Sequence, residues 1–537
     1  NLISRLIFAY SLPTNLDKFY MKFITNKSKV LFFLLSVLSI PSAFAQEQGL
    51  DQRIDQAFKP FSDKVSEIVF FEILGVPFVL ILLVASALFF TIYFGFVNIR
   101  RFPTAINVVR GKYDELDKSD SGESKEGEVT HFQALATAVS GTVGNGNIAG
   151  VALAIALGGP GATFWMVICG LLGMSSKFVE CTLGVQYRDV GEDGTIYGGP
   201  MYYISKGLKE RGFTNLGKVA AVFFAIFCIG GSFGGGNAAQ SNQATIVLKD
   251  LMSLESTAAG FWIGIILAFL VGIIIIGGIK RIAQVTEKVV PFMAVMYIIA
   301  CLYIILSNFS LIDDAFSLIV SEAFNPKAIG VGGVIGVLLV GFKRAAFSNE
   351  AGAGSASIAH SAVKTKYSAS EGLVALLEPF IDTVVICTMT ALVIIIFNFG
   401  GAFEYGGEGA VMIDGISYEG AGITSIAFGE YIPYSNIFLT IAVVLFAVST
   451  MISWSYYGLQ SWKYLFGRGK VADLTYKLLF LVFVIIGASA SMNSIWAFSD
   501  AMIFAMVFPN MIGLFFLFPV VKKELKKYIN AIKTLES

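Results

Sequence analysis

Charged residues are scarce in this chain of 537 residues: Asp, Glu, Lys and Arg make up 14% of it, and apolar residues make up 55%. The mean hydropathy is +0.73. A soluble protein would have to bury about ten apolar runs of about twenty residues in one core, so the composition indicates a polytopic membrane protein. Acidic and basic residues balance at 38 each, so the net charge gives no indication of a nucleic-acid partner.

Metal-binding and catalytic patterns are also scarce. There are only two histidines, His131 and His360, and the five cysteines lie scattered in apolar segments without CxxC spacing. Such cysteines are typical of small buried apolar residues rather than of metal ligands or disulfides. The sequence contains neither a P-loop nor an HExxH motif. We therefore expect no enzyme, no cofactor and no metal beyond a transported cation.

The N-terminal region has the pattern of a targeting signal. Residues 22–29 contain three lysines, residues 30–40 are apolar, and Ala43-Phe44-Ala45 fits an A-x-A cleavage site. We expect residues 1–45 to be an upstream extension and a signal peptide, with the true start at Met21 and cleavage after Ala45. The alternative is an uncleaved first spanning anchor. After cleavage, the amphipathic residues 46–72 would lie on the extracytoplasmic side.

Eleven apolar segments are long enough to cross a bilayer of about 30 Å. Lys and Arg are concentrated in alternate gaps between these segments and in the tail 521–537, which places the mature N-terminus outside and the C-terminus in the cytoplasm. The expected spans are residues 73–97, 133–157, 162–186, 216–247, 259–279, 285–307, 329–360, 372–398, 436–465, 474–492 and 495–520.

Two of these spans are interrupted by glycine-rich polar stretches, residues 141–150 (the first break) and residues 347–357 (the second break). Glycine is a poor helix former, and Asn, Thr and Glu are costly in hydrocarbon. Backbone can leave the helix at membrane depth only where protein or a water-filled cavity satisfies its N–H and C=O groups. Two such breaks, one in each half of a chain, point to the binding site of a transporter.

The order of the broken spans predicts an internal repeat. They are the second and seventh spans, and an odd offset of five means that they cross the membrane in opposite directions. Residues 133–307 (spans two to six) and 329–520 (spans seven to eleven) can therefore form inverted-topology repeats. The span at 73–97 is then an extra transmembrane helix outside this symmetry.

The breaks and two further spans supply candidate ligands. Unwound carbonyl groups can coordinate a cation such as Na⁺, and the free N–H groups of a restarting helix can bind a carboxylate. The candidate substrate-binding residues are Gly141, Thr142, Val143, Gly144, Asn145, Gly146, Phe233, Asn237, Gln240, Asn242, Phe347, Ser348, Asn349 and Trp454. The candidate cation-binding residues are Thr142, Asn145, Glu350, Ser449, Thr450 and Ser453.

Each set has a simpler interpretation. The glycines of the first break also fit close helix packing, and the polar residues of span four, such as Asn237 and Asn242, also fit interhelical hydrogen bonds. Ser449 and Ser453 can bond back to carbonyls of their own helix. Glu350 can carry a proton or a cation, or it can accept hydrogen bonds from freed N–H groups or from Arg344.

These residues resemble the alanine/glycine:cation symporter family, also called sodium:alanine symporters. The resemblance runs from about residue 75 to 525 and is strongest at residues 141–152, 198–204, 347–356 and 449–458. It implies an all-α polytopic membrane protein with a leucine-transporter-type 5+5 inverted repeat after one extra transmembrane helix. The implied place of action is the inner membrane of a bacterium.

The family resemblance also implies a function. We expect Na⁺-coupled uptake of small neutral amino acids, alanine or glycine, by alternating access. The substrate carboxylate would meet Thr142 to Asn145, and Phe233 and Trp454 would limit the size of its side chain. The cation would use span-two carbonyls with Ser449, Thr450 or Ser453. The alternatives are an H⁺-coupled symporter that uses Glu350, or a channel or sensor on the same scaffold.

Overall fold

The computed structural model describes residues 50–117, 127–254, 256, 258–325, 332–407, 409–489 and 492–537. The expected signal peptide and its cleavage site after Ala45 lie outside the described residues. Helices dominate, in agreement with the expected all-α fold, and the sheets in the described part are three antiparallel hairpins. Their strands are β1 (Glu72–Ile73) with β2 (Val76–Pro77), β3 (Asp189–Val190) with β4 (Ile196–Tyr197), and β5 (Ala410–Ile413) with β6 (Ile416–Glu419).

The elements before the first break begin with an amphipathic helix, α3 (Leu50–Val69), which packs against the last helix of the chain. The apolar helix α4 (Phe78–Tyr93) lies inside the expected extra span at 73–97. Three short pieces then lead to the broken span: α5 (Val97–Arg100), α6 (Phe102–Val109) and the turn η2 (Asp114–Asp117).

Seven long apolar segments can cross a membrane, or eight if the bent helix pair at residues 131–158 counts as one. Two more expected spans coincide with the shorter apolar helices α4 and α13 (Ala259–Ile275), and another with α16 (Gly333–Asn349). The count of eleven therefore stays a prediction. The seven long segments are α9 (Gly161–Gln186), α11 to α12 (Thr214–Met252), α14 (Gly278–Ser307), α18 to η8 (Ser368–Gly400), α22 (Ser435–Phe466), α23 (Lys470–Ser489) and α24 (Met492–Glu536).

Two of the long segments contain wide π-helical turns. The first consists of α11 (Thr214–Phe233), η4 (Gly234–Ala238) and α12 (Ala239–Met252), and the second includes η7 (Phe380–Cys387). Such turns inside helices are frequent at functional sites. The remaining pieces are α10 (Pro200–Glu210), η5 (Phe309–Leu311), α15 (Ile312–Phe324), α17 (Ser357–His360), α18 (Ser368–Val374), α19 (Leu377–Pro379), α20 (Thr388–Phe397), η8 (Asn398–Gly400) and α21 (Ala421–Tyr431).

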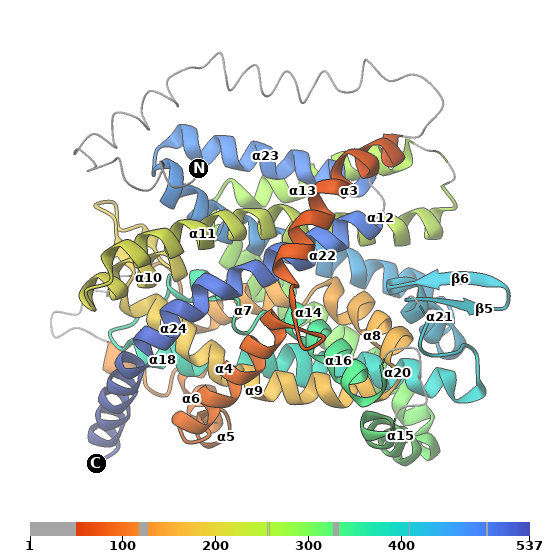
Figure 1. Ribbon diagram of the computed structural model, residues 1–537, viewed down its shortest axis with the longest axis horizontal. Coiled ribbons are helices and arrows are strands. Elements are labelled where there is room, and N and C mark those ends of the chain that lie inside the picture. Colours follow the sequence, from red (N-terminus) through yellow and green to blue (C-terminus); the bar gives the residue numbers. More distant parts are fainter. Residues whose placement is uncertain are drawn as a thin grey trace. The chain divides into compact units, whose positions relative to one another are not determined.

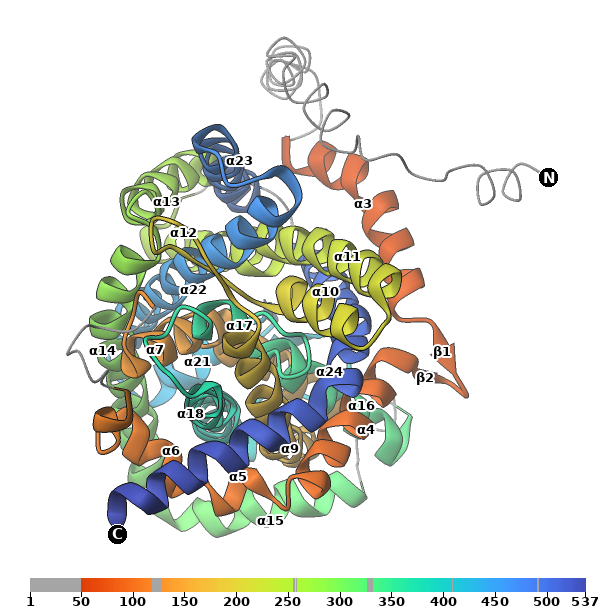
Figure 2. The same cartoon turned by 90° about the vertical axis from the view of Figure 1, so that its left-hand side faces the viewer.

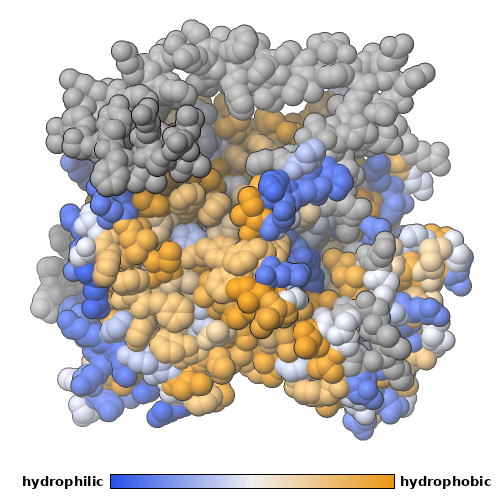
Figure 3. Space-filling model, viewed as in Figure 1, coloured by the Kyte–Doolittle hydropathy of each residue, from blue (hydrophilic) through white to orange (hydrophobic). Residues whose placement is uncertain are grey.

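Large apolar side chains lie exposed along the outer helices. Trp262 and Phe269 of α13 are 62% and 67% exposed, and Phe292 of α14 is 62% exposed. Figure 3 shows apolar residues over much of the centre of one face, with hydrophilic residues gathered along its left edge. A soluble monomer rarely exposes so much contiguous apolar surface, whereas a bilayer would cover it. The described part is therefore that of a multi-pass membrane protein.

The helix ends are sorted to two sides. In Figure 1, α6, α10, α18 and the C-terminal end of α24 lie at the left, and the same elements are in view in Figure 2. The short helices α15 and α21 and the hairpin β5–β6 lie on the opposite side in Figure 1. The basic tail, and elements of the expected basic gaps that follow the first, third and seventh spans, lie on the first of these two sides.

Candidate functional site

The first break is present in the structure. Helix α7 (His131–Thr142) begins at a capping box formed by Thr130 and Gln133, and Val143 and Gly144 then leave the helix. The chain continues through a π-helical turn, η3 (Gly146–Gly150), into α8 (Val151–Gly158), and the two halves are bent by 52°. All residues from 141 to 150 are buried, so the backbone freed here is enclosed by protein.

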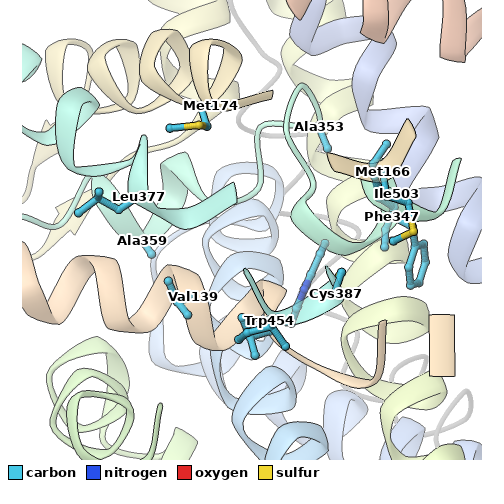
Figure 4. Close-up of a cluster of buried hydrophobic side chains, with 14 of the residues drawn as sticks. Val139, Met166, Met174, Phe347, Ala353, Ala359, Leu377, Cys387, Trp454 and Ile503 are labelled. Atoms are coloured by element: carbon cyan, nitrogen blue, oxygen red, sulfur yellow. The ribbon is translucent and has the colours of Figure 1, made fainter. Parts of the chain in front are cut away.

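The second break is present as well. Helix α16 ends at Asn349, and Glu350 takes a left-handed conformation with φ 53°. Gly352 and Gly354 follow with φ 94° and 91°, values that favour glycine, before α17 begins at Ser357. Figure 4 shows both interruptions: the helix with Val139 passes into a loop, and Ala353 lies on the loop near the helix with Phe347.

Helix α22 lies beside the first break. Ser140 Oγ donates to the Ser449 carbonyl over 2.7 Å, and Thr450 Oγ1 donates to the Ser140 carbonyl over 3.1 Å. A Cβ atom on Gly144 would lie 2.5 Å from Thr450 Oγ1, so the missing side chain permits this close approach. The structure therefore brings the predicted cation residues Ser449 and Thr450 to the first break.

Gln240 of α12 binds the first break from another direction. Its Oε1 accepts from the Asn145 backbone N–H over 3.1 Å, and its own amide donates to the Gly235 carbonyl over 2.9 Å. Asn145 Oδ1 and Ser453 Oγ are buried and have no hydrogen-bond partner among the described residues. Buried polar atoms normally have partners, so these two are available for a ligand.

Trp454 and Glu350 connect α22 to the second break. Trp454 Nε1 donates to Glu350 Oε1 over 3.1 Å, and the Ser355 hydroxyl donates to the other carboxylate oxygen. Arg344 does not pair with Glu350; its Nη2 lies 2.5 Å from Asp500 Oδ2. One of the alternatives for Glu350 was a hydrogen bond from Arg344, and the structure does not contain it.

Three predicted substrate residues of span four and its π-turn contact α23. Phe233 stacks on Phe483 with ring centroids 4.5 Å apart. Asn237 and Asn242 donate to backbone carbonyls of α23 at Phe480 and Gly487, over 2.7 and 3.2 Å. These contacts are the interhelical hydrogen bonds of the simpler interpretation, and the assignment of the three residues to a substrate site stays a prediction.

The other predicted residues lie in the breaks themselves. Thr142 Oγ1 bonds back to the Ala138 carbonyl over 3.3 Å, and Phe347 packs on Trp496 with ring centroids 5.2 Å apart. Asn349 caps the turn that follows it, because its Oδ1 accepts from the Ala351 N–H over 3.0 Å. A Cβ atom on Gly146 would lie 3.6 Å from Ser348 Oγ, so the two breaks meet here.

Sequence reasoning missed Asp382 of η7 as a site residue. Its carboxylate accepts from Asn147 Nδ2 of the first break over 2.7 Å and from Ser348 Oγ of the second break over 2.9 Å. The available signal was an acidic residue inside an apolar span, because such residues are rare and usually functional. Only the fold shows that this carboxylate lies between the two breaks.

Comparison with known proteins now identifies the family. The model of the sodium:alanine symporter family matches residues 60–537. The chain belongs to this family. The sodium/alanine symporter AgcS of Methanococcus maripaludis is 39% identical over 86% of this chain and 96% of its own length. The probable sodium/glutamine symporter GlnT of Bacillus subtilis is 32% identical over 85% of this chain and 89% of its own length.

Among solved structures, the chain is similar to MhsT in complex with L-phenylalanine, with a TM-score of 0.48 and 15% identity. The similarity covers 75% of this chain and 100% of that one.

On the side that bears the C-terminus, the symporter chain contains a series of buried ion pairs. Glu371 of α18 contacts both His131 of α7 and, at 2.5 Å, His360 of α17. Lys177 of α9 pairs with Glu378 of α19 over 2.9 Å. Breaking a buried pair by removing one partner is strongly destabilising, so these contacts hold the ends of both broken spans together.

A backbone connection reinforces these ion pairs. Val129, just before α7, pairs with Val363, just after α17, in a parallel bridge. The Lys364 N–H donates to the Val129 carbonyl over 2.8 Å, and the Glu128 N–H donates to the Ala362 carbonyl over 2.7 Å. The segment that enters the first broken span is thus bonded to the segment that leaves the second.

Proposed function

We propose that this chain is a secondary active transporter that couples the entry of Na⁺ to the uptake of small neutral amino acids, alanine or glycine, by alternating access. Membership of the sodium:alanine symporter family supports this proposal. So do the relatives, one of which is named a sodium/alanine symporter and another a sodium/proton-dependent alanine carrier.

The observation that carries the proposal is the meeting of two interrupted spans around unpaired polar atoms. Among the described residues, Asn145 Oδ1 in the first break and Ser453 Oγ, one turn along α22 from Ser449, are buried and have no hydrogen-bond partner. A zwitterionic amino acid can supply a donor and an acceptor at once, and a desolvated cation can use the free oxygens. In this proposal the substrate carboxylate meets residues 142–145, and Trp454 limits the size of the substrate side chain.

The proposed cation uses carbonyls of the first break together with Ser449, Thr450 or Ser453. The hydroxyls of Ser449 and Thr450 donate to the Phe446 and Ser140 carbonyls, respectively. The lone pairs of both hydroxyl oxygens therefore remain available as acceptors. Oxygen atoms are the ligands that hard cations prefer. Glu350 would serve the alternative, H⁺-coupled transport.

We propose the expected orientation for this transporter, with the mature N-terminus outside the cell and the C-terminus in the cytoplasm. Helix α10, which contains Lys206 and Lys209, the basic tail of α24, and α6, which follows Arg100 and Arg101, are gathered on one side, which supports this orientation. The inverted repeats at 133–307 and 329–520 are supported by one observation. Each of these two segments opens with an interrupted helix, and the two interruptions meet.

Uptake of radiolabelled alanine into proteoliposomes tests the function. We expect accumulation under an inward Na⁺ gradient, its loss in Asn145→Ala, and its retention in the matched control Asn530→Ala on the exposed surface of α24. Accumulation driven only by a pH gradient would move the proposal to H⁺ coupling. Downhill flux without accumulation would indicate a channel, and no flux at all would indicate a sensor.

A further inference from the structure

The turn between α4 and α5 holds an apolar side chain outward in a strained conformation. Gly95 and Phe96 both take left-handed conformations, with φ 62° and 57°. For a bulky residue such as phenylalanine this conformation is an outlier, and outliers of this kind cluster at functional sites. Phe96 is nevertheless 50% exposed, so packing within the protein does not account for its position. The turn is therefore a candidate for contact with a partner.

Contacts on the inner face of α5 fix this turn. Val97 is buried, and Asn98 Nδ2 donates to the Leu171 carbonyl of α9 over 2.8 Å. On the outer face, Ile99 is 67% exposed, and Ile92 at the end of α4 is 60% exposed. Apolar side chains held outward on a membrane protein are suited to contact the acyl chains of a lipid.

Two cations lie at the same turn. Lys522 Nζ of α24 lies 4.4 Å from the centre of the Tyr93 ring, and Arg100 Nη1 donates to the Gly95 carbonyl over 3.5 Å. Both cationic residues are exposed. Neither forms an ion pair with an acidic residue in the part of the chain that the structure describes. Two uncompensated positive charges from separate helices thus meet at one exposed turn.

The contacts just before this turn indicate its level in the membrane. Phe89 of α4 packs on Phe515 of α24 with ring centroids 5.6 Å apart, and Tyr93 packs on Phe518 at 4.7 Å. Phe89 and Phe515 are each more than a third exposed, as lipid-facing side chains are. Tyrosine collects where the hydrocarbon of a bilayer ends, and lysine side chains near helix ends reach the headgroups. Lys522, over the ring of Tyr93, therefore lies at headgroup level.

The tail of α24, residues 521–537, extends this positive charge. Its buried residues Val521 and Tyr528 pack it against the rest of the protein. Its lysines lie outside this contact and are exposed: Lys522, Lys523, Lys526, Lys527 and Lys533. Four or more basic residues directly after a membrane-spanning helix are typical of binding sites for anionic lipids. In Figure 2, the C-terminal part of α24 runs across the side that also carries α5 and α6.

From this arrangement, we propose that the turn after α4 and the start of the tail of α24 form a binding site for an anionic phospholipid. Lys522 and Arg100 bind the phosphate of its headgroup, and Ile92, Phe96 and Ile99 contact its acyl chains. Guanidinium and ammonium groups both form strong charge-assisted hydrogen bonds to phosphate. A zwitterionic headgroup brings its own ammonium to two cations, so a headgroup with net negative charge fits better. This site lies outside the two breaks and does not depend on Na⁺ coupling.

Thermal unfolding of the purified full chain in detergent tests the site without transport. Phosphatidylglycerol is titrated into the micelles, and phosphatidylcholine with the same acyl chains is titrated into a parallel sample. We expect a saturable rise in unfolding temperature with phosphatidylglycerol, and at least a fivefold higher midpoint in the double variant Lys522→Gln/Arg100→Gln. The matched control is Lys533→Gln/Arg110→Gln, which removes one exposed lysine and one exposed arginine away from the turn. Its midpoint should stay within twofold of the wild-type value.

A second variant, Phe96→Asn, tests the apolar half of the site and keeps both charges. Asparagine tolerates the left-handed conformation, so this variant should unfold at the same or a higher temperature without lipid. Its phosphatidylglycerol midpoint should nevertheless rise at least threefold, which relief of strain alone would not produce. A midpoint within twofold of the wild type would remove the acyl-chain contact and overturn the site, whether or not the double variant folds.

Three further outcomes would overturn the proposal. An equal rise with phosphatidylcholine would show that the site does not prefer a negative charge. An equal rise with glycerol phosphate, which has the headgroup without acyl chains, would show that the occupant is not a lipid. A midpoint of the control variant shifted as far as that of Lys522→Gln/Arg100→Gln would show diffuse attraction to the basic surface instead of a site at this turn.

Discussion

The two breaks interrupt their helices by different means. The first break contains one internal hydrogen bond, from the Gly144 N–H to Asn147 Oδ1, and is bonded to other elements, because Gln240 accepts from Asn145 and Asp382 accepts from Asn147. The second break has two hydrogen bonds of its own, in which Asn349 caps Ala351 and Ser355 bonds to Glu350. It also accepts from other elements, because Trp454 donates to Glu350 and Asn510 donates to the Gly352 carbonyl. Left-handed conformations at residues 350, 352 and 354 occur only in the second break.

Because the two breaks are built differently, we expect them to respond differently when neighbouring helices move. A turn built from its own left-handed residues keeps its shape when its neighbours move, since the shape is encoded locally. The first break has no such left-handed residues, so its shape depends more on its hydrogen bonds to α12 and η7. We therefore expect the first break to be the adaptable part of the site and the second to be the rigid part.

The largest expected effect is a loss of stability at the second break, the rigid part of the site. In Gly354→Ala, a Cβ atom would lie 2.8 Å from Pro200 and 3.0 Å from Asn510, at a φ of 91°. Left-handed strain and overlap together should cost about 2–5 kcal/mol, measured as a lower unfolding temperature in detergent. Gly401→Ala, with φ 74° and nothing within 4 Å, carries the strain without the overlap and should cost clearly less. Equal losses would show that packing at residue 354 is unimportant.

The next effect concerns the adaptable break. In Gly144→Ala, the added Cβ meets Thr450 Oγ1 at 2.5 Å and Gln240 Oε1 at 3.2 Å. We expect at least a tenfold loss of alanine uptake, because α22 and α12 would be pushed away from the break. Gly150→Ala is the matched control: this residue of η3 has nothing within 4 Å, and its uptake should stay close to that of the wild type. A similar loss in both variants would argue against a specific contact at Gly144.

A smaller effect on stability and alanine affinity distinguishes a hydrogen bond to the first break from one within the second break. Gln240→Ala removes an acceptor from the first break, and Ser355→Ala removes a donor from within the second. Each should cost about 1–3 kcal/mol through an unpaired buried partner. We expect Gln240→Ala to weaken alanine affinity more than Ser355→Ala, measured by binding of radiolabelled alanine and by thermal unfolding. The reverse order would assign adaptability to the second break.

The smallest expected effect lies outside both breaks, at Asp189 after α9. Burial alone would raise the pKa of Asp189, but hydrogen bonds from Lys206 and Arg468 outweigh it and hold the pKa below its ordinary value. A lowered folded-state pKa adds stability above the unfolded-state value, and this stability is lost as pH falls through the folded-state value. After solvent screening, Asp189→Asn should cost about 0–1 kcal/mol at pH 7.

A pH series of thermal unfolding curves checks the Asp189 prediction. The difference between wild type and Asp189→Asn should be largest near neutral pH and should shrink below about pH 4, where an unfolded Asp takes up its proton. A difference that grows toward acidic pH would contradict the assigned sign.

The sequence predicted both breaks because glycine and polar residues inside apolar spans are a local signal. It also placed Ser449, Thr450 and Trp454 near them, through a resemblance rather than through geometry. It did not reveal the partners of Asn147 and Ser348, because Asp382 is separated from Asn147 by more than two hundred residues and looks like any other buried acid. Likewise, nothing in residues 233–242 alone tells whether their amides turn toward the breaks or toward α23.

The parallel bridge between Val129 and Val363 has a mechanical consequence. With these bonds intact, the start of α7 cannot swing outward alone, since it would pull the end of α17 along. Glu371, which contacts His131 and His360 on either side of that bridge, makes the coupling stiffer. We therefore expect α7 and α17 to move together, and to separate only if these hydrogen bonds and the contacts of Glu371 break.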